Sequence, residues 1–151
     1  MEITDLIGPD QVVAGLRAGD KSHLLLELAR RSAGATGLPQ QLVRDALEAR
    51  EKLGSTGVGA GIAIPHAPID GLERFFGMFV RLDRRIDYQA VDDQSVDLVF
   101  LLLAPGDLKD HLQVLACISR RLRDTRVAGS LRKAPDAAAL YDALTGTSPA
   151  A

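Results

Sequence analysis

Residues 50–66 read Arg-Glu-Lys-Leu-Gly-Ser-Thr-Gly-Val-Gly-Ala-Gly-Ile-Ala-Ile-Pro-His, and no other part of the chain resembles this stretch. Four of the eight residues at positions 54–61 are glycines. This density indicates backbone that approaches another group closely, although a flexible surface turn is the alternative for any glycine-rich loop. A short β-prone segment, residues 62–64, then leads to Pro65 and His66.

The loop lacks the spacing of the common nucleotide-binding motifs. Gly57-x-Gly59-x-Gly61 is not the G-x-G-x-x-G pattern of dinucleotide-binding folds, and it runs into a β-prone segment instead of a helix. Residues 54–61 contain no lysine, whereas the phosphate loop of NTPases needs Gly-Lys-Ser/Thr. The chain has no G-x-S-x-G elbow, so Ser55 is not indicated as a hydrolase nucleophile.

We interpret His66 as a nucleophile. Pro65 has a fixed φ and favours extended backbone at the residue before it, so the approach to His66 should be rigid. A neutral imidazole suits reversible phosphoryl transfer, because it can attack and its phosphoramidate bond is readily passed on. The alternative for a single histidine is a structural role in closing a turn. The candidates for a polar phosphate cradle beside it are Ser55, Thr56, Gly57 and Gly59.

Two further side chains are candidates for stabilising a transferred group. His111 is expected in the first turn of a helix capped by Asp107, where the positive helix end favours anions and a neutral imidazole. Arg50 ends the helix before the glycine loop, and its guanidinium offers phosphate a planar fork. The alternatives are a His111 that faces solvent and an Arg50 that satisfies only helix-end carbonyls.

The other histidine and the single cysteine indicate no further chemistry. Three histidines without a cysteine pair or an HxxxH pair make a poor zinc site, so neither a metal nor another cofactor is expected. His23 lies in a leucine-rich stretch and is interpreted as structural or partly exposed. Cys117 lies within an apolar helical pattern and is expected in the core.

Helical and strand patterns alternate unevenly along the rest of the chain. Strands are expected at residues 12–16, as an edge strand, at 75–82, and at 96–103, whose unbroken apolar character indicates burial on both faces. Helices are expected at residues 20–34, 39–52, 107–122 and 136–144. The second helix places Leu42 and Val43 on one face, and the third places His111, Leu112 and Leu115 at helical spacing. This order favours an α/β (α+β layered) fold, a mixed β-sheet flanked by helices.

Length and composition are those of one globular domain, which we assign to residues 1–146, with a flexible tail at 147–151. The net charge of −2, the scattered basic residues and the absence of Trp argue against a nucleic-acid partner. The acidic start, the lack of a long apolar run and the single cysteine predict a cytoplasmic protein that is not embedded in a membrane.

Residues 50–66 resemble the phosphorylation-site signature of the fructose/mannitol-class EIIA domains of the bacterial phosphoenolpyruvate-dependent phosphotransferase system. Within that class they are most similar to the nitrogen-regulatory branch, EIIA-Ntr. Residues 91–98, 103–105 and 111–115 also match the class in order and spacing, so the resemblance extends from about residue 3 to residue 144. The fold that it implies is a mixed β-sheet flanked by helices.

The resemblance implies that His66 is phosphorylated by a histidine-phosphorylated HPr-like (NPr-like) protein. His111 matches the family's second active-site histidine, which is thought to hold the phosphoryl group and orient the first. Arg50 matches a nearby arginine, a candidate for charge stabilisation. The acceptors would be an EIIB domain or regulatory target proteins. Because no EIIB or EIIC segment is attached, we expect a free-standing EIIA with a nitrogen or potassium regulatory role; the alternative is a fructose/mannitol EIIA that relays phosphate to an EIIB for sugar uptake.

Two functions of other classes stay open on the residues alone. One is an interaction module, in which the loop and His66 bind a partner without phosphate, and the other is a small-molecule or nucleotide sensor that uses the glycine loop. If His66 is phosphorylated, water must be kept from it, so an apolar rim is predicted. The candidates for this rim are Ile62, Ile64 and either Phe75 or Phe76.

Overall fold

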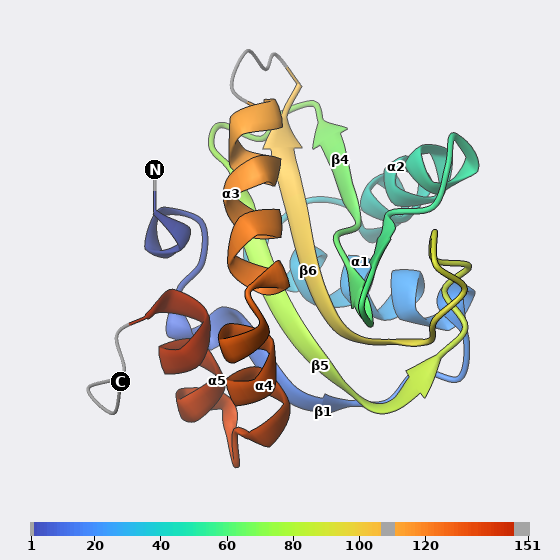
Figure 1. Cartoon of the computed structure of the whole chain (residues 1–151). Coiled ribbons are helices and arrows are strands. Elements are labelled where there is room, and N and C mark those ends of the chain that lie inside the picture. The colour runs from blue at the N-terminus through green and yellow to red at the C-terminus, as the bar shows by residue number, and fades with distance from the viewer. Residues whose placement is uncertain (1, 107–110, 147–151) are drawn as a thin grey trace.

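A mixed β-sheet with helices against both faces makes up residues 2–106 and 111–146, the part of the chain that the computed structural model describes (Figure 1). In these residues six strands form one sheet in the order β1-β5-β6-β3-β2, and β4 also pairs with β6. The strands are β1 (Val12–Leu16), β2 (Gly57–Gly59), β3 (Ile62–Ala63), β4 (His66–Ile69), β5 (Phe76–Ile86) and β6 (Val96–Pro105). The helices are α1 (Lys21–Thr36), α2 (Gln40–Lys52), α3 (His111–Arg123), α4 (Thr125–Lys133) and α5 (Ala137–Thr145). The predicted fold class is confirmed.

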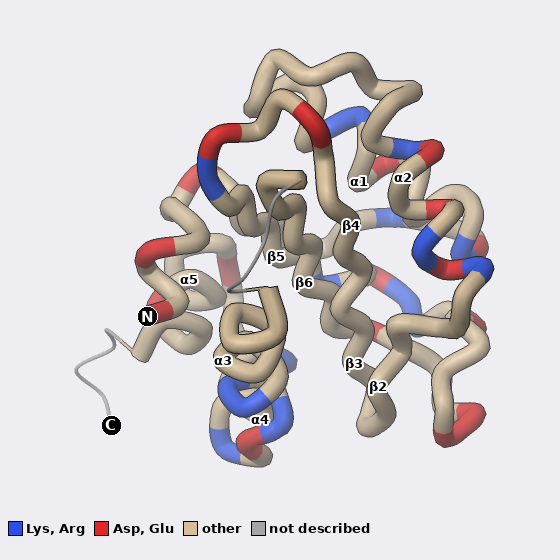
Figure 2. Tube along the Cα trace, turned by 90° about the horizontal axis from the view of Figure 1, so that it is seen from above, with Lys and Arg blue, Asp and Glu red and all other residues tan. Residues whose placement is uncertain are grey.

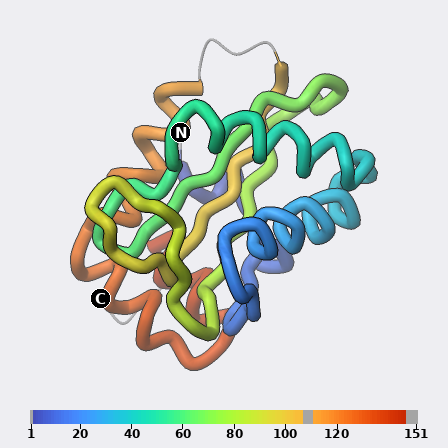
Figure 3. The backbone as a smooth tube through the Cα atoms, turned by 90° about the vertical axis from the view of Figure 1, so that its right-hand side faces the viewer, coloured from blue at the N-terminus to red at the C-terminus, as the bar shows by residue number. Residues whose placement is uncertain are grey.

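Strand β6 is central, and its two faces contribute to two hydrophobic cores. Val99 and Leu101 belong to the core beneath α1 and α2, whereas Leu98 and Phe100 belong to the core beneath α3, α4 and α5. This split follows from the alternation of side chains across a strand. Figure 3 shows α1 and α2 side by side, and Figure 2 shows the other three helices across the strands from them. The predicted burial of β6 on both faces is confirmed.

Both parallel and antiparallel pairs occur in the sheet. β1 pairs with β5 in parallel, at the edge where it was predicted, and β5 pairs with β6 antiparallel. β3 and β4 both run parallel to β6, with Ile62 opposite Leu98 and His66 opposite Leu102. Between these pairs, Leu102 donates its N–H to the Pro65 carbonyl at 3.0 Å. The segment from β3 to β4 therefore follows β6 as a single interrupted strand.

Strand β4 was not predicted, because it has only four residues and one of them is Pro68. A proline cannot donate to a strand ladder, so it is confined to edge strands or bulges. β4 satisfies this condition, because within the described residues it pairs on one side only, with β6, and is therefore an edge strand. The predicted β-prone segment at residues 62–64 corresponds to β3, and His66 begins the next strand, β4.

The first helix is longer than predicted. Asp20 caps it as expected, accepting a hydrogen bond from the His23 N–H at 2.8 Å. The predicted end at Gly34 was wrong, because α1 continues to Thr36 and ends at Gly37, whose φ is 79°. A glycine inside a helix costs only about 1 kcal/mol relative to alanine, which is too little to stop a well-packed helix. The left-handed conformation at Gly37 ends the helix instead.

Two helix faces differ from the predictions. On α2, Val43 and Leu47 are buried, but Leu42 is 42% exposed. On α3 the buried residues are Val114, Ile118 and Leu122, while Leu112 is 80% exposed. The buried residues of α3 have the same helical spacing as the predicted ones, so periodicity alone could not identify the buried face. The predicted cap Asp107 lies outside the described residues, as does the predicted tail at 147–151.

Helix α4 was missed, whereas α5 was predicted correctly. Asp124 caps α4, and the helix buries Val127, Ala128 and Leu131. Its nine residues include a central glycine and a serine, which obscured the helical pattern. The last helix starts after its cap Asp136 and ends at Gly146, as expected. No helix in residues 2–106 or 111–146 combines the length and apolar character needed to cross a bilayer.

Candidate active site

The glycine-rich loop forms a tight hairpin that leads the chain to His66. β2 and β3 pair antiparallel, and positive φ angles at Gly59, Ala60 and Gly61 make the turn between them. At Gly57 a Cβ atom would lie 2.8 Å from the Ala90 backbone, so this position requires glycine. The close approach that the loop composition indicates is therefore made to other parts of the protein. After the hairpin, Ile64 and Pro65 connect β3 to β4.

Hydrogen bonds to both ring nitrogens orient the half-buried imidazole of His66. Nδ1 lies 2.8 Å from the Ile64 carbonyl oxygen, which can only accept, so Nδ1 carries the proton. Nε2 accepts from Arg50 Nε at 3.2 Å, which requires a lone pair on Nε2. The two contacts assign the same neutral tautomer, with the proton on Nδ1 and the lone pair on Nε2.

Arg50 reaches His66 from the last turn of α2. Besides the contact with His66, its Nη1 donates to the Gly54 carbonyl at 2.9 Å. Gly54 belongs to the short connection between α2 and the hairpin, where the Gly54 N–H donates back to the Glu51 carbonyl at 3.1 Å. The guanidinium is therefore held at a helix end and across the start of the loop, with one edge against the imidazole.

His111, the first described residue of α3, lies against His66. The ring centroids are 5.3 Å apart and the ring planes cross at 83°, an edge-to-face arrangement. His111 Nε2 is buried and has no hydrogen-bond partner within the described residues. A buried ring nitrogen without a partner is costly in a folded protein, and it marks a place where a further polar group can bind. The structure thus brings Arg50, His66 and His111 together, although 61 positions separate the first from the last.

Both imidazoles favour the neutral form. Burial lowers the pKa of His66, as do the charges of Arg50 and His111, while the Nδ1 bond to Ile64 and the charge of Glu51 oppose the shift. Burial and the Arg50 charge also lower the pKa of His111. Near neutral pH the site therefore combines one permanent cation with two neutral rings, an arrangement that can receive an anion.

The four residues predicted as a phosphate cradle are engaged within the protein. The Thr56 N–H donates to Glu51 Oε1 at 3.0 Å, and the Gly57 N–H donates to Ser55 Oγ at 3.1 Å. Ser55 Oγ donates to the Tyr88 carbonyl at 3.2 Å, and Gly59 provides a positive φ for the turn. These groups hold the hairpin in place, and none of these hydrogen bonds points to His66.

The predicted apolar rim was wrong in part. Ile62 and Ile64 are 1% and 4% exposed and lie in the core, because both precede β4 on the strand segment that packs along β6. Phe75 and Phe76 are partly buried against the two cores. The large apolar side chains exposed next to the site in the chain are Leu53, after the end of α2, and Leu112, after His111.

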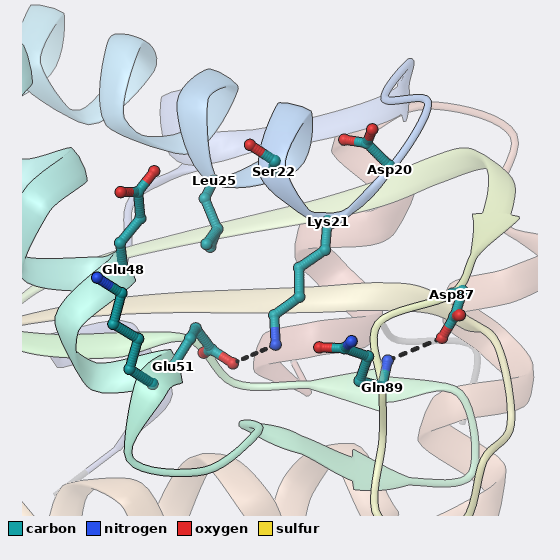
Figure 4. A pocket seen from close by; sticks show the side chains of 9 residues that line it. Asp20, Lys21, Ser22, Leu25, Glu48, Glu51, Asp87 and Gln89 are labelled. Carbon is teal, nitrogen blue, oxygen red and sulfur yellow. Dashed lines mark hydrogen bonds and ion pairs between the residues drawn. The ribbon is translucent and has the colours of Figure 1, made fainter.

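Sequence reasoning missed a cluster around Glu51, and Figure 4 shows two of its members, Lys21 and Glu51, from close by. Lys21 Nζ from α1 pairs with Glu51 Oε1 from α2 at 2.9 Å, and the Tyr88 hydroxyl donates to Glu51 Oε2 at 3.1 Å. A sequence signal was available, because an acid in the last turn of a helix and a lysine in the first turn both oppose the helix dipole. Across residues 2–106 and 111–146, no group of three acidic, histidine or cysteine side chains is arranged to hold a metal ion.

Comparison with known proteins agrees with the fold. Residues 5–146 match the family model described as "Phosphoenolpyruvate-dependent sugar phosphotransferase system, EIIA 2". The chain is 50% identical over 145 residues to a nitrogen regulatory protein of Bradyrhizobium diazoefficiens, covering 95% of each chain. It is 36% identical over 149 residues to a nitrogen regulatory protein of Escherichia coli, covering 97% of this chain and 91% of that one.

The solved structures give the same result. The nitrogen regulatory protein IIA-Ntr of Neisseria meningitidis superposes with a TM-score of 0.89 at 31% identity, over 95% of this chain and 99% of the other. The IIA mannitol protein of E. coli superposes with a TM-score of 0.76 at 22% identity over 91% and 98%, which supports the fold alone. The chain belongs to the EIIA 2 family of the phosphoenolpyruvate-dependent sugar phosphotransferase system.

Proposed function

We propose that this chain is a cytoplasmic phosphocarrier with a nitrogen-regulatory role, which accepts a phosphoryl group on His66 Nε2 from a histidine-phosphorylated HPr-like protein. The observation that carries the proposal is the environment of Nε2. This nitrogen carries an unprotonated lone pair that accepts from Arg50, and a second neutral imidazole lies beside it. These are the groups that a phosphoryl transfer to nitrogen requires: a nucleophile with fixed aim and donors for the anionic oxygens.

The transfer balances as a direct displacement at phosphorus. The Nε2 lone pair of His66 attacks the phosphorus, the N–P bond of the donor phosphohistidine breaks, and its electron pair returns to the donor imidazole. No proton leaves His66 in this step, because the proton stays on Nδ1 and remains hydrogen-bonded to the Ile64 carbonyl. That hydrogen bond stabilises the partial positive charge which the ring acquires as the new N–P bond forms.

Arg50 and His111 stabilise the charge on the transferred group. When phosphorus occupies the lone pair of Nε2, the guanidinium exchanges its bond to nitrogen for bonds to phosphoryl oxygens, for which its geometry is suited. His111 Nε2, which has no hydrogen-bond partner in the described part of the chain, donates to another phosphoryl oxygen. The exposed Leu53 and Leu112 lie next to these residues in the chain and supply apolar surface for a partner that keeps water out.

The regulatory role rests on relatives that match this chain nearly from end to end. Those named nitrogen regulatory proteins are 34–50% identical over 142 residues or more. A fructose-specific EIIA component of Haloferax volcanii is 40% identical over 101 residues, 66% of this chain. The alternative, a relay to an EIIB domain for fructose or mannitol uptake, has less support. Regulatory target proteins are therefore the proposed acceptors or partners.

A reconstitution tests the proposal. The protein is incubated with phosphoenolpyruvate, enzyme I and an HPr-type carrier, and the intact mass is followed. We expect an adduct of one phosphoryl group that is stable in base and labile in acid and that is absent from His66→Ala. An adduct that survives in His66→Ala would move the site elsewhere. Failure of every HPr-type donor to modify the wild-type chain would favour the interaction-module or sensor hypothesis.

A further inference from the structure

Glu51 is a carboxylate that is buried almost completely and hydrogen-bonded at every position. Its side chain is 6% exposed. Oε1 accepts from Lys21 Nζ at 2.9 Å and from the Thr56 N–H at 3.0 Å. Oε2 accepts from the Tyr88 hydroxyl at 3.1 Å and from the Thr56 hydroxyl. Since a carboxylate offers about four lone-pair positions, all of them are used.

The donors to Glu51 come from three separate parts of the chain. Lys21 is on α1, Thr56 is at the start of the glycine hairpin, and Tyr88 lies between β5 and β6. The Lys21 ammonium also lies 4.5 Å from the centre of the Tyr88 ring, a cation–π contact. Burial raises the pKa of Tyr88 well above its ordinary value, so its hydroxyl keeps the proton that it donates.

The charges of Lys21 and Glu51 do not stabilise the helices on which they lie. Lys21 is the first residue of α1 and Glu51 is the last but one of α2. Both have the unfavourable sign for their helix end, because helix N-termini favour anions and C-termini favour cations. Lys21 reaches from α1 to Glu51 on α2, and both side chains line the pocket drawn in Figure 4. The helix dipoles therefore do not explain these positions of Lys21 and Glu51, whereas the hydrogen bonds from the Glu51 carboxylate to Thr56 do.

One series of hydrogen bonds leads from Glu51 to Nδ1 of His66. The carboxylate fixes Thr56 by both its N–H and its hydroxyl. The Thr56 carbonyl accepts from the Ile64 N–H at 3.0 Å, and the Ile64 carbonyl accepts from His66 Nδ1 at 2.8 Å. The Nδ1 proton of His66 is thus hydrogen-bonded to the Ile64 carbonyl, and Ile64 is itself held by its hydrogen bond to Thr56.

A second series leads from Glu51 to Nε2 of His66. The main-chain carbonyl of Glu51 accepts from the Gly54 N–H. The Gly54 carbonyl accepts in turn from Arg50 Nη1 at 2.9 Å. Arg50 Nε then donates to His66 Nε2. Residues 51–56 are therefore fixed at one end by helix α2 and at the other end by the bonds from the Glu51 side chain to Thr56. This holds the Gly54 carbonyl in position to accept from Arg50 Nη1.

We propose that Glu51 is a positioning residue for phosphoryl transfer at His66, acting through Thr56 and Ile64 on one ring nitrogen and through Gly54 and Arg50 on the other. This inference rests on the proposed function of His66. The Glu51 side chain is buried, and none of its hydrogen bonds described above reaches the imidazole, so we expect it to affect the rate of the chemical step and to leave donor binding unchanged. Lys21 supplies the counter-charge that allows the carboxylate to be buried.

The test compares Glu51→Gln with Glu48→Gln, which removes the same charge one turn earlier on α2, where the side chain is 38% exposed. Transfer from a phosphorylated HPr-type carrier is measured by rapid quench, per folded molecule. We expect Glu51→Gln to lower kcat about tenfold or more with KM for the donor unchanged, since an interaction that acts in the transition state is lost. We expect Glu48→Gln to behave like the wild type.

A double-mutant cycle with Arg50→Ala separates positioning from general loss of structure. If Glu51 acts largely through Arg50, then Glu51→Gln in the Arg50→Ala background lowers kcat by about threefold or less, because the two effects are not additive. Equal effects in both backgrounds would overturn the route through Gly54 and Arg50, and an unchanged kcat in Glu51→Gln would overturn the whole proposal. If Glu51→Gln does not fold, Tyr88→Phe replaces it; it removes one donor, keeps the ring, and should lower kcat about threefold in the same cycle.

Nitrogen NMR of the His66 ring tests positioning without phosphoryl transfer. In the wild type, we expect a neutral ring protonated at Nδ1. In Glu51→Gln we expect a mixture of tautomers and a His66 pKa lower than that of the wild type, since the Glu51 charge raises it. An unchanged tautomer and pKa would overturn the proposal. If the wild-type chain accepts no phosphoryl group but Glu51→Gln still shows these NMR changes, the proposed function is contradicted and the positioning of the ring by Glu51 is not.

Discussion

Arg50 Nε donates to the nitrogen of His66 that is proposed to attack phosphorus, at 3.2 Å. In this state the guanidinium masks the lone pair of the nucleophile. The same guanidinium faces the place that an anionic phosphoryl group would occupy. Approach of the donor therefore exchanges a bond from the guanidinium to a neutral nitrogen for bonds to anionic phosphoryl oxygens, in which both donor and acceptor are charged.

Loss of Arg50 should slow transfer without removing the acceptor nitrogen. We expect Arg50→Ala to lower the rate of His66 phosphorylation by about 10²- to 10³-fold, the range found when one donor to a developing charge is removed. Arg50→Lys should recover only part of this, because an ammonium does not reproduce the planar fork. Rapid quench measures both variants. Arg44→Ala, on the same helix in a surface pair with Glu48, is the control, and a rate equal to that of Arg50→Ala would contradict the assignment.

His111→Ala should slow transfer and leave final occupancy of His66 intact. His111 contributes one N–H to the phosphoryl group, so we expect a loss of about tenfold to a hundredfold, equivalent to one charge-assisted hydrogen bond. Intact mass at long times measures occupancy, and quenched early time points measure rate. His23→Ala changes a histidine at the start of α1, away from the site, and should be silent. If neither rate nor occupancy changes in His111→Ala, its proposed role is wrong.

The lowered pKa of His66 gives the acceptor a defined pH dependence. A base with a lowered pKa stays neutral into mildly acid solution, so the phosphorylation rate should begin to fall only below the ordinary histidine value of about 6.5. The unfolded chain binds the proton more tightly, so this group's contribution to folding stability is complete above that value. It is lost as pH falls through the window down to the folded pKa. Ring NMR titration and initial rates should give the same lowered midpoint.

Two glycine substitutions should have opposite effects on stability. In Gly57→Ala the new Cβ would lie 2.8 Å from the Ala90 backbone, so we expect a loss of about 1–3 kcal/mol, typical of overpacking. In Gly34→Ala the new Cβ meets no atom within 4 Å inside helix α1, so we expect a gain of about 0.4–1 kcal/mol. Denaturant unfolding checks both. A Gly57→Ala protein as stable as the wild type would contradict the requirement for close approach.

Local chemistry made several features of the fold predictable. Asp20 and Asp136 cap helices because their side chains satisfy free N–H groups, and Gly146 ends α5 because it adopts a positive φ. The apolar run of β6 predicted its central place. Features that depend on distant residues were missed: β4 exists because β6 offers it a ladder, and α4 because the core beneath it accepts Val127, Ala128 and Leu131.

The site likewise combines features that the local sequence predicts with features that depend on distant residues. Arg50 and His66 are close in the chain, and the motif between them indicated that they work together. The direction of the loop's hydrogen bonds was not predictable, because Tyr88 and Ala90, which hold Ser55 and Gly57, come from more than 30 positions away. The tautomer of His66 likewise depends on which carbonyl and which arginine nitrogen reach the ring, and no sequence pattern specifies these.

Pro68, within the edge strand that starts at His66, has a consequence for self-association. A phosphocarrier must present its phosphorylated group to one protein after another, and the proposed acceptor, His66, begins a strand at the margin of the sheet. An uninterrupted strand edge invites pairing with a strand of another molecule. Pro68 removes one N–H from that edge two residues beyond His66, so neighbouring copies lose a continuous ladder by which to join. The strand that carries the imidazole is thus protected against aggregation at the point where it must stay accessible.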